Sequence, residues 1–287
     1  MATNEDRNID RQVVSDFGRE WKSFDYSSAE TEESLDTQFL AYIAPIDLKR
    51  FSNLSAIAAD FGAGSGRWSI RFAPYFKSIY AVEPSDGASE VLRKKFEQEV
   101  RVKVLQESVG ANSIPDGTLD FAVSLGVLHH IPDTALAISD IAKKMKPGGE
   151  FLCYLYYKLE GKPFYYRFIF AIANVVRNLV SRSPYPVKRL VSKLIAVFIY
   201  LPLARFSKLL HKAGRNVENI PLHQYREMPF YMLANDALDR FGTRLEQRFS
   251  KEEIAEMLSK AGFDMSTLKF SDAEPFWTFS VRKLAAY

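Results

Sequence analysis

The sequence predicts an α/β fold: a doubly wound, mostly parallel, seven-stranded sheet with an N-terminal helical cap and a helical insertion. Two observations predict it. Five short apolar runs are separated by helical or turn-rich stretches between residues 55 and 157, and two more follow a well-capped helix near the C-terminus. Strands that alternate with helices form crossover units, which make a parallel sheet. Continuous apolar strands suit a sheet that is covered on both faces.

The elements follow one another in a regular order. Each strand is expected where a short apolar run ends in a turn or polar residue. The predicted strands are 55–62, 78–85, 102–108, 119–126 and 150–157. Helices are predicted over 66–74, 86–98 and 134–145. The sequence MKPGGE at 145–150 is typical of a turn that closes the last of these helices.

The two ends of the chain complete this pattern. Phe17, Trp21 and Phe24 lie on one stripe of a predicted helix. Ser250 and Gly262 mark the start and stop of a predicted helix, and the last two strands are expected at 266–271 and 275–284. The predicted organisation is a helical cap at 1–50, a cofactor-binding core at 51–157, a helical lid at 158–249 and the rest of the core at 250–287.

Composition predicts a cytoplasmic protein with one unusual segment. Apolar residues make up 47% of the chain and charged residues 25%, and the single cysteine excludes an internal disulfide. The polar N-terminus predicts no signal peptide. The uncharged apolar runs at 168–176 and 194–204 are shorter than the ~18 residues that span a bilayer. Residues 158–215 carry a net charge of +11 and the rest of the chain −8, which predicts an anionic partner for that segment.

The sequence ADFGAGSGRW at 59–68 predicts a ligand-binding turn after the first strand. Glycines allow close approach of the backbone to a ligand, and the following helix directs free N–H groups into the crevice. A dinucleotide fingerprint needs a third glycine where this chain has Arg67. Glu83 ends the second strand, where a carboxylate can accept both hydroxyls of a ribose. These residues predict a nucleoside-type ligand rather than NAD or FAD.

Four motifs together resemble the class I S-adenosylmethionine-dependent methyltransferases. They are the glycine loop, the acid at the end of the second strand, LDFAVSLGVLHHIPD at 119–133 and MKPGGEFL at 145–152. The LHHIPD form is similar to the quinone-biosynthesis type. The resemblance covers residues 55–157 and, more weakly, 250–284. FGREW and DALDRFGTRLEQRF resemble a bacterial subgroup associated with surface-glycan or specialised-metabolite loci. The resemblance implies a Rossmann-like fold with S-adenosylmethionine as methyl donor.

Site roles follow from this resemblance position by position. Asp60 and the backbone of Gly62, Ala63, Gly64 and Gly66 are expected to meet the methionine end of the cofactor. Glu83 is expected to hold the ribose, with Pro84 near the adenine. Ser108, followed by Val109, stands where the family usually has an adenine-contacting aspartate, which puts the affinity in doubt. Ser124 and Leu125 are expected beside the sulfonium. Arg67 and Trp68 are either loop-covering or helix-surface residues.

Methyl transfer to a hydroxyl needs a group that accepts its proton, most often a histidine near neutral pH. His130 and His129 directly follow the fourth strand and are the leading candidates. The alternative is that both histidines are structural. Many members of the family that this chain resembles methylate without a histidine base. His223, with Tyr225 and Arg226 beside it, is a third candidate in the lid.

The acceptor is predicted to be a small molecule. Tyr225 and Arg226 suit a phosphate, carboxylate or sugar hydroxyl; Tyr156 and Tyr157 line either the substrate side or the core. We expect O-methylation of a sugar or lipid-linked glycan hydroxyl. The alternatives are a quinone-like or other apolar acceptor, and a cofactor-binding protein without turnover. No metal-ligand spacing occurs in the sequence.

The basic insertion has two compatible interpretations. Its aliphatic and aromatic residues with regularly placed Lys and Arg suit either a lid over the substrate or an amphipathic surface at an anionic membrane, through residues 158–215. The second interpretation predicts a peripheral location at the inner membrane surface. Nucleic acid is disfavoured because the segment is too aliphatic. The sequence predicts no particular oligomeric state.

Overall fold

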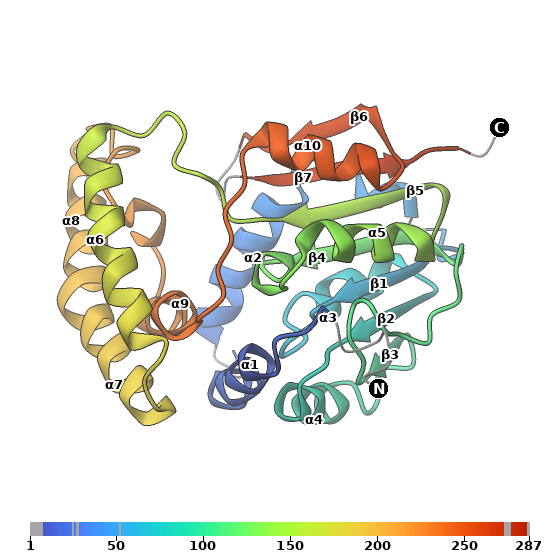
Figure 1. Cartoon of the computed structure of the whole chain (residues 1–287), viewed down its shortest axis with the longest axis horizontal. Coiled ribbons are helices and arrows are strands. Elements are labelled where there is room, and N and C mark those ends of the chain that lie inside the picture. The colour runs from blue at the N-terminus through green and yellow to red at the C-terminus, as the bar shows by residue number, and fades with distance from the viewer. Residues whose placement is uncertain (1–7, 25, 27–28, 52, 273–276, 286–287) are drawn as a thin grey trace. The chain divides into compact units, whose positions relative to one another are not determined.

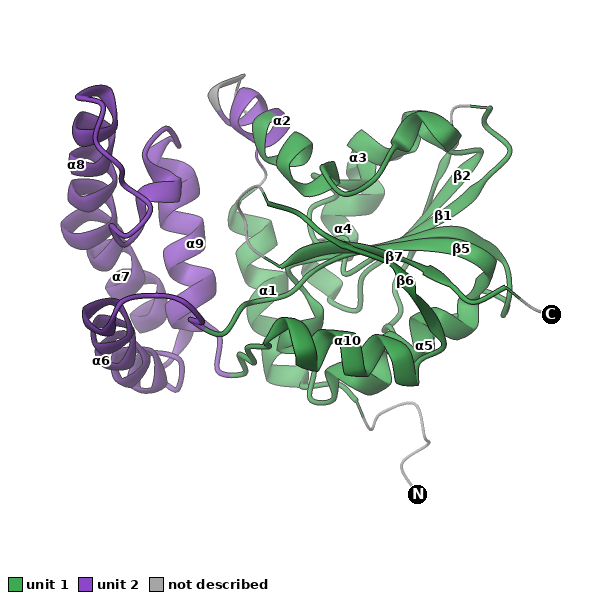
Figure 2. Ribbon diagram, turned by 90° about the horizontal axis from the view of Figure 1, so that it is seen from above, with its two compact units in different colours: residues 1–25, 37–158, 245–287 green, residues 26–36, 159–244 purple. Residues whose placement is uncertain are grey.

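A computed structural model describes residues 8–24, 26, 29–51, 53–272 and 277–285. Residues 1–7 of the predicted cap and 275–276 of the last predicted strand lie outside this part. The chain divides into two compact units, shown in different colours in Figure 2. Unit 1 comprises residues 1–25, 37–158 and 245–287, and unit 2 comprises 26–36 and 159–244. Residues 245–249 of the predicted lid thus belong to unit 1, and residues 26–36 of the predicted cap belong to unit 2.

Unit 1 is built on one seven-stranded sheet in the order β3-β2-β1-β4-β5-β7-β6 (Figure 1). The first five strands are parallel, and β7 runs antiparallel to both β5 and β6. The strands are β1 (Ile57–Phe61), β2 (Ser78–Val82), β3 (Val102–Leu105), β4 (Leu119–Leu125), β5 (Met145–Tyr154), β6 (Phe263–Phe270) and β7 (Thr278–Lys283). The predicted fold class and number of strands are confirmed.

Most helices of unit 1 begin at residues whose side chains cap them. Their bounds are α1 (Arg11–Ser23), α3 (Ser69–Phe72), α4 (Asp86–Lys95), α5 (Thr134–Lys144) and α10 (Lys251–Lys260), and α2 (Ala29–Ile43) contributes residues to both units. Ser250 and Glu253 form the reciprocal capping box at α10, as predicted. Ser85 and Asp133 cap α4 and α5. One core cluster of unit 1 combines Phe61 and Phe151 of the sheet with the apolar faces of α5 and α10. Phe121 of β4 packs instead against Phe72 and Phe76.

Two predicted boundaries are wrong, each for a local reason. The helix predicted over 66–74 is only the four-residue α3 followed by a short 3₁₀ turn at 73–75. Pro74 explains this, since proline removes one helical hydrogen bond and clashes with the preceding turn. The turn predicted at 145–150 lies inside β5: Met145 pairs with Leu119 and Glu150 with Phe121, so the intervening residues bulge out of the ladder.

Helix α1 crosses α4 at two glycines. A Cβ atom built on Gly87 would lie 2.4 Å from the carbonyl oxygen of Gly18, and one built on Gly18 would lie 3.1 Å from Cβ of Ser85. Contacts of 2.4 Å to backbone cannot be relieved by a side-chain rotation. The glycines therefore let the two helix backbones approach closely, and this contact positions the N-terminal helix.

Gly87→Ala is expected to lower the free energy of unfolding by about 1–3 kcal/mol, because the added methyl group overpacks the helix crossing. Alanine in an unconstrained helical position would instead stabilise the protein by about 0.5–1 kcal/mol. Urea denaturation followed by circular dichroism measures the change. Gly110→Ala is the matched control, since its Cβ would meet only the carboxylate of Asp140, at 3.2 Å. Equal stability of Gly87→Ala and wild type would show that the crossing is not tight.

Unit 2 is helical, with α6 (Phe164–Val180), α7 (Tyr185–Ile195), a π-helical turn at 196–200, α8 (Leu201–Lys212) and α9 (Phe230–Gly242). Its core gathers Ala196 and Tyr200 of the π turn with Leu233, Ala237 and Phe241 of α9. Tyr26 joins this unit by packing edge-on against Tyr231, at 5.3 Å between ring centroids, and by hydrogen bonding to Asn235.

One helical stretch of unit 2 corrects the estimate of apolar length made from sequence. Residues 185–212 form 28 consecutive helical residues, and their most apolar 18-residue window has a mean hydropathy of 1.6. The helix is therefore long and apolar enough to cross a membrane by length and composition, although one face is packed within unit 2. The uncharged runs seen in the sequence were shorter because single cations interrupt them.

Candidate cofactor and active site

The glycine loop follows β1 and contacts the end of the neighbouring strand β2. The backbone N–H groups of Gly62 and Ala63 donate to the carbonyl of Val82 at 2.8 and 3.1 Å, which ties the loop to β2. Gly64 has φ +55°, and a Cβ there would lie 2.9 Å from the indole of Trp21. Gly66 has φ +73° and packs against α4. Packing against α4 thus explains why residue 66 is a glycine, and packing against Trp21 of α1 explains Gly64.

Trp21 of α1 covers the glycine loop, a contact that was not predicted from the sequence. It was predicted only to lie on one stripe of a helix, and the structure places its ring against Gly64. The guanidinium of Arg67 lies 4.8 Å from the centroid of the Trp21 ring and 5.0 Å from that of Trp68. Arg67 therefore clamps Trp21 over the loop, which favours the loop-covering interpretation of that arginine. A glycine inside α1, three residues before Trp21, was the available signal of close packing.

Asp60 is a buried carboxylate at the end of β1. Its Oδ2 accepts a hydrogen bond from the Ser69 hydroxyl at 2.6 Å. Burial raises the pKa of Asp60 to about 6, with the nearby Glu83 carboxylate acting in the same direction and Arg67 against it. An ionised Asp60 in this position is under-solvated, so a cationic ligand group beside it would be stabilised.

Glu83 closes the other side of the loop. Its two carboxylate oxygens accept hydrogen bonds from the backbone N–H of Gly64 at 3.1 Å and of Ser85 at 2.9 Å. Burial raises the pKa of Glu83 despite these hydrogen bonds. Each carboxylate oxygen has a further lone pair, so Glu83 can hold the loop and accept hydroxyl groups from a ligand at once.

The remaining cofactor candidates are engaged in local structure. The hydroxyl of Ser108 accepts from the backbone N–H of Ala111 at 3.2 Å, and Val109 is buried in the core. Ser124 is fully buried and donates to the Phe61 carbonyl at 2.9 Å, joining β4 to β1. Leu125 is buried at the end of β4 and Pro84 is half-buried after β2. These positions stay predictions as cofactor contacts.

His129 and His130 form an aromatic cluster beyond the carboxyl end of β4. The His129 ring stacks on Tyr156, with 3.8 Å between centroids and 23° between planes, and lies 4.2 Å from the His130 ring. Phe17 of α1 packs on His130 at 5.1 Å, and Arg248 lies 4.9 Å over the Tyr156 ring. The cluster thus joins residues from the first, central and last parts of unit 1, and Arg248 and Phe17 were not among the predicted site residues.

The two histidines are chemically different. His129 is fully buried, and neither ring nitrogen has a hydrogen-bond partner among the described residues. Burial, aided by His130 and Arg248, lowers the pKa of His129 well below its usual 6.5, so its ring is neutral at pH 7. Nδ1 of His130 lies 2.7 Å from the carbonyl oxygen of Leu245. Because a carbonyl only accepts, Nδ1 carries a proton, so Nε2 is the nitrogen that can carry a lone pair.

The segment 245–249 holds this cluster in place. The backbone N–H of Gln247 donates to the carbonyl of His129 at 3.0 Å, and its side-chain amide donates to that of Ile131 at 2.6 Å. Arg248 forms an ion pair with Glu246 at 2.7 Å and donates to the Tyr157 carbonyl. This return segment could not be predicted from the sequence because its pairing is non-local.

The other predicted substrate residues have structural partners. Tyr157 bridges Phe249 and packs edge-on against Trp277 at 5.9 Å. His223, Tyr225 and Arg226 belong to unit 2, where His223 donates from Nδ1 to the Ile220 carbonyl at 2.9 Å and Arg226 donates to the His223 carbonyl at 3.1 Å. The histidine cluster belongs to unit 1, and a role of these three residues at the acceptor site stays a prediction. No group of three or more metal-ligating side chains occurs in the described part of the chain.

The sheet order, the glycine loop and the two buried acids define a nucleoside-binding domain of the class I methyltransferase type. Residues 59–153 match the family model described as a methyltransferase domain. The chain is 31% identical over 104 residues to the uncharacterized methyltransferase YcgJ of Bacillus subtilis, which covers 35% of this chain and 41% of that protein. The chain thus carries a class I S-adenosylmethionine-dependent methyltransferase domain, with S-adenosylmethionine as methyl donor.

Two further relatives are more distant. Demethylmenaquinone methyltransferase of Bacillus licheniformis is 27% identical over 102 residues, covering 34% of this chain and 44% of that protein. Human N-acetylserotonin methyltransferase, in complex with S-adenosylmethionine, superposes with a TM-score of 0.51 at 13% identity, covering 89% of this chain and 54% of that chain. That likeness shows the fold alone. The chain spans less than half the length of the curated relatives named here.

The residues present fit S-adenosylmethionine. Buried Asp60 lacks a cationic partner strong enough to hold its pKa at the ordinary value, which a ligand ammonium would supply. Glu83 keeps lone pairs for ribose hydroxyls, and the Ser65 hydroxyl in the loop is buried with no hydrogen-bond partner among the described residues. When bound, the cofactor supplies a methyl group on a sulfonium that is already a good leaving group.

Proposed function

We propose that this chain methylates a hydroxyl group of a small molecule, with His130 as the proton acceptor. One observation carries the proposal: the hydrogen bond from Nδ1 to the Leu245 carbonyl fixes the tautomer of His130 and leaves Nε2 as the basic nitrogen. His130 follows the same strand, β4, that pairs with β1 and its glycine loop. Proton removal and alignment of the nucleophile are what the protein adds to an already activated methyl donor.

His129 has a different role in this proposal. Its neutral ring forms part of an aromatic wall with Tyr156, and its buried nitrogens have no protein partner among the described residues. Buried polar atoms without partners are unfavourable, so a hydroxyl of the acceptor is a suitable hydrogen-bond partner for them. His129 thus positions the acceptor while His130 takes its proton.

We propose two candidate classes of methyl acceptor. The cationic unit 2 supports a sugar or lipid-linked glycan, the acceptor predicted from the sequence, if that acceptor carries a phosphate. The aromatic cluster of His129, His130, Tyr154, Tyr156 and Phe17 supports a planar apolar acceptor, and demethylmenaquinone methyltransferase is among the relatives of the chain. Incubating the protein with cell extract and S-adenosylmethionine labelled in the methyl group separates them. Label in a water-soluble product favours a sugar. Label in the organic phase favours a lipid-linked glycan if mild acid hydrolysis releases it into the water phase, and a quinone-like acceptor if it does not.

His130→Ala is expected to lower kcat by about 10²–10⁴-fold, the usual contribution of a general base, while leaving the Kd for S-adenosylhomocysteine within twofold. Single-turnover assays with the acceptor found above measure the first quantity, and calorimetry measures the second. His211→Ala, at an exposed position of α8, is the matched control. A kcat for His130→Ala within twofold of wild type would refute the assignment of the base.

A further inference from the structure

Helix α6 presents its apolar side chains to solvent and buries a charge. Eight large apolar residues of this helix are exposed. Phe164 at 83% and Leu179 at 68% are the most exposed, and the others are Tyr165, Phe168, Ile169, Ile172, Val175 and Val176. They recur at helical spacing and so form one continuous face. On the opposite face Arg177 is buried, and its guanidinium donates to the carbonyls of Thr243 and Arg244. This distribution is the reverse of that in a helix packed on a soluble core.

The helix formed by α7, the π turn and α8 has the same reversed character. Its exposed side includes Leu190, Leu194, Phe198, Phe206 and Leu209, with Phe198 71% and Leu209 67% exposed. Its buried side is formed largely by small or polar residues: Lys188, Ser192, Ala196, Tyr200, Ala204 and Ser207. The hydroxyls of Ser192 and Ser207 have no hydrogen-bond partner among the described residues. Large apolar groups therefore face outward where small and polar groups face inward.

The π turn keeps this outward face continuous. A regular helix advances about 100° per residue, so buried positions 188, 192 and 195 would be followed by 199 and 202–203. The structure buries Tyr200, Ala204 and Ser207 instead. The extra residue of the π turn at 196–200 shifts the register by one position and so keeps both faces aligned along the helix.

Both helices belong to one surface of unit 2. Each packs on α9, and in both views α6 and α7–α8 lie on the same side of α9 (Figures 1 and 2). Contiguous exposed apolar surface of this extent marks an interaction site. The question is which partner covers it.

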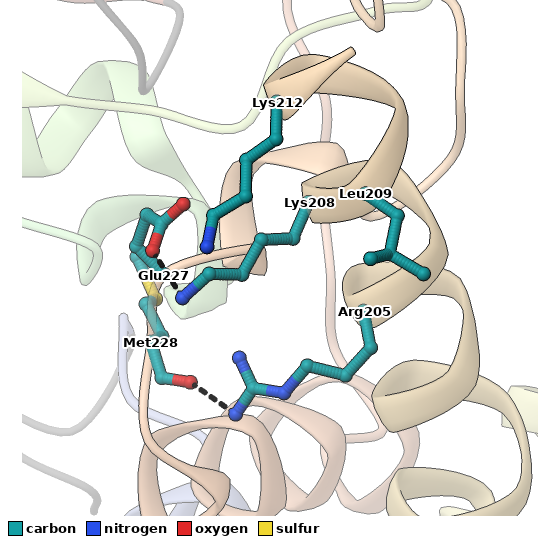
Figure 3. A pocket seen from close by; sticks show the side chains of 6 residues that line it. All are labelled: Arg205, Lys208, Leu209, Lys212, Glu227 and Met228. Atoms are coloured by element: carbon teal, nitrogen blue, oxygen red, sulfur yellow. Dashed lines mark hydrogen bonds and ion pairs between the residues drawn. The ribbon is translucent and has the colours of Figure 1, made fainter.

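Charge selects the partner. Arg167, Arg182, Arg189, Lys193 and Lys212 are exposed on or beside these helices, and Glu160 is the one acid within residues 158–215. At the end of α8 a cavity of about 470 Å³ is lined by Arg205, Lys208, Leu209, Lys212, Glu227 and Met228 (Figure 3). Lys208 pairs with Glu227 at 2.6 Å, so the other two cations give the cavity a net positive charge. A second copy of the chain would set two such positive faces against each other.

We propose that α6 and α7–α8 form a membrane-binding face that lies in the headgroup region of an anionic bilayer. The outward apolar side chains enter the acyl boundary, and the surrounding cations contact lipid phosphates. The inner face of α7–α8 is packed on α9, so the helix lies along the surface rather than across the bilayer. The 28-residue helix is thus an interfacial element despite its length. This inference does not depend on the identity of the methyl acceptor.

Flotation of the full chain with vesicles tests the proposal. Vesicles of 30% phosphatidylglycerol in phosphatidylcholine are expected to bind the protein at 50 mM salt, with at least tenfold weaker binding to pure phosphatidylcholine. Alkaline carbonate should release the bound protein, since the helix does not span. No binding to anionic vesicles, or retention after carbonate treatment, would overturn the proposal.

Matched substitutions locate the face. Phe198→Glu combined with Leu209→Glu should weaken vesicle binding at least tenfold, and Phe168→Glu combined with Leu179→Glu should do so independently. Val100→Glu, at a 91% exposed position in unit 1, is the control and should bind as wild type does. Circular dichroism confirms that each variant is folded. A dimer in analytical ultracentrifugation that both pairs of substitutions dissociate, together with unchanged vesicle binding, would assign the face to a second copy of the chain instead.

Discussion

Replacing Glu83 with glutamine is expected to weaken the binding of S-adenosylhomocysteine by about 10–100-fold. Hydrogen bonds to a charged group contribute about 1.5–3 kcal/mol, and each 1.4 kcal/mol is a factor of ten in Kd. The glutamine amide offers one acceptor oxygen where Glu83 offers two, and its NH₂ group would face the N–H of either Gly64 or Ser85. The substitution therefore disturbs both the ribose contact and the loop.

Calorimetry with two ligands shows which end of the ligand Glu83 contacts, and circular dichroism shows that the variant is folded. Methylthioadenosine keeps the ribose but lacks the amino acid, so Glu83→Gln should weaken both ligands similarly. Glu90→Gln is the control because Glu90 lies on the exposed surface of α4 and forms an ion pair with Lys22. Wild-type affinity of Glu83→Gln for S-adenosylhomocysteine would contradict the assigned role of the acid.

Asp60→Asn is expected to raise stability and lower affinity at the same time. The pKa of Asp60 is raised from the ordinary value of 3.8 to about 6 in the folded protein, so the folded state holds this proton more tightly than the unfolded state does. The resulting stabilisation is complete below pH ~4 and is lost as the pH rises through about 6. At pH 7.5 the ionised group opposes folding by about 3 kcal/mol, at 1.36 kcal/mol per pKa unit.

Asparagine removes this unfavourable charge, so the free energy of unfolding should rise by about 1–3 kcal/mol at pH 7.5 and by progressively less as the pH falls toward 4. Urea denaturation across this pH range measures the difference.

The same variant should bind S-adenosylhomocysteine at least tenfold more weakly and methylthioadenosine normally, since only the former carries the ammonium group. Wild-type affinity should fall below pH 6 as Asp60 is protonated. An equal loss of affinity for both ligands would show that Asp60 does not contact the amino-acid end of S-adenosylhomocysteine.

Sequence reasoning performed best where the chemistry is local. The glycine loop, Asp60 and Glu83 occur within 24 consecutive residues, and strand ends that follow one another in a parallel sheet must meet at one edge. The capping box at Ser250 and Glu253 was likewise predictable, because both hydrogen bonds lie within one turn. Errors arose at Pro74 and at the bulge in β5, where one residue or one extra loop changes the local geometry.

The candidate acceptor site could be predicted only in part. His129 and His130 are adjacent in sequence, yet nothing in that dipeptide indicates which ring nitrogen is fixed or which ring lies without partners. Those properties depend on Leu245 and Tyr156, which reach the pair through segments distant in the chain. Trp21 was predicted only as part of a helix stripe for the same reason, since its contact with Gly64 requires the crossing of α1 and α4 at Gly18 and Gly87.

By itself, therefore, the sequence determined the fold class and the methyl donor and predicted a nucleoside site, because hydrophobic period, glycine spacing and the ends of successive strands act over short stretches of chain. Tertiary structure alone decided the tautomer of His130, the isolation of His129 and the residue that covers the glycine loop. It also decided which face of each helix in unit 2 is outward. Amphipathic periodicity shows that a helix has two faces, but only packing against α9 shows that the small and polar face is the buried one.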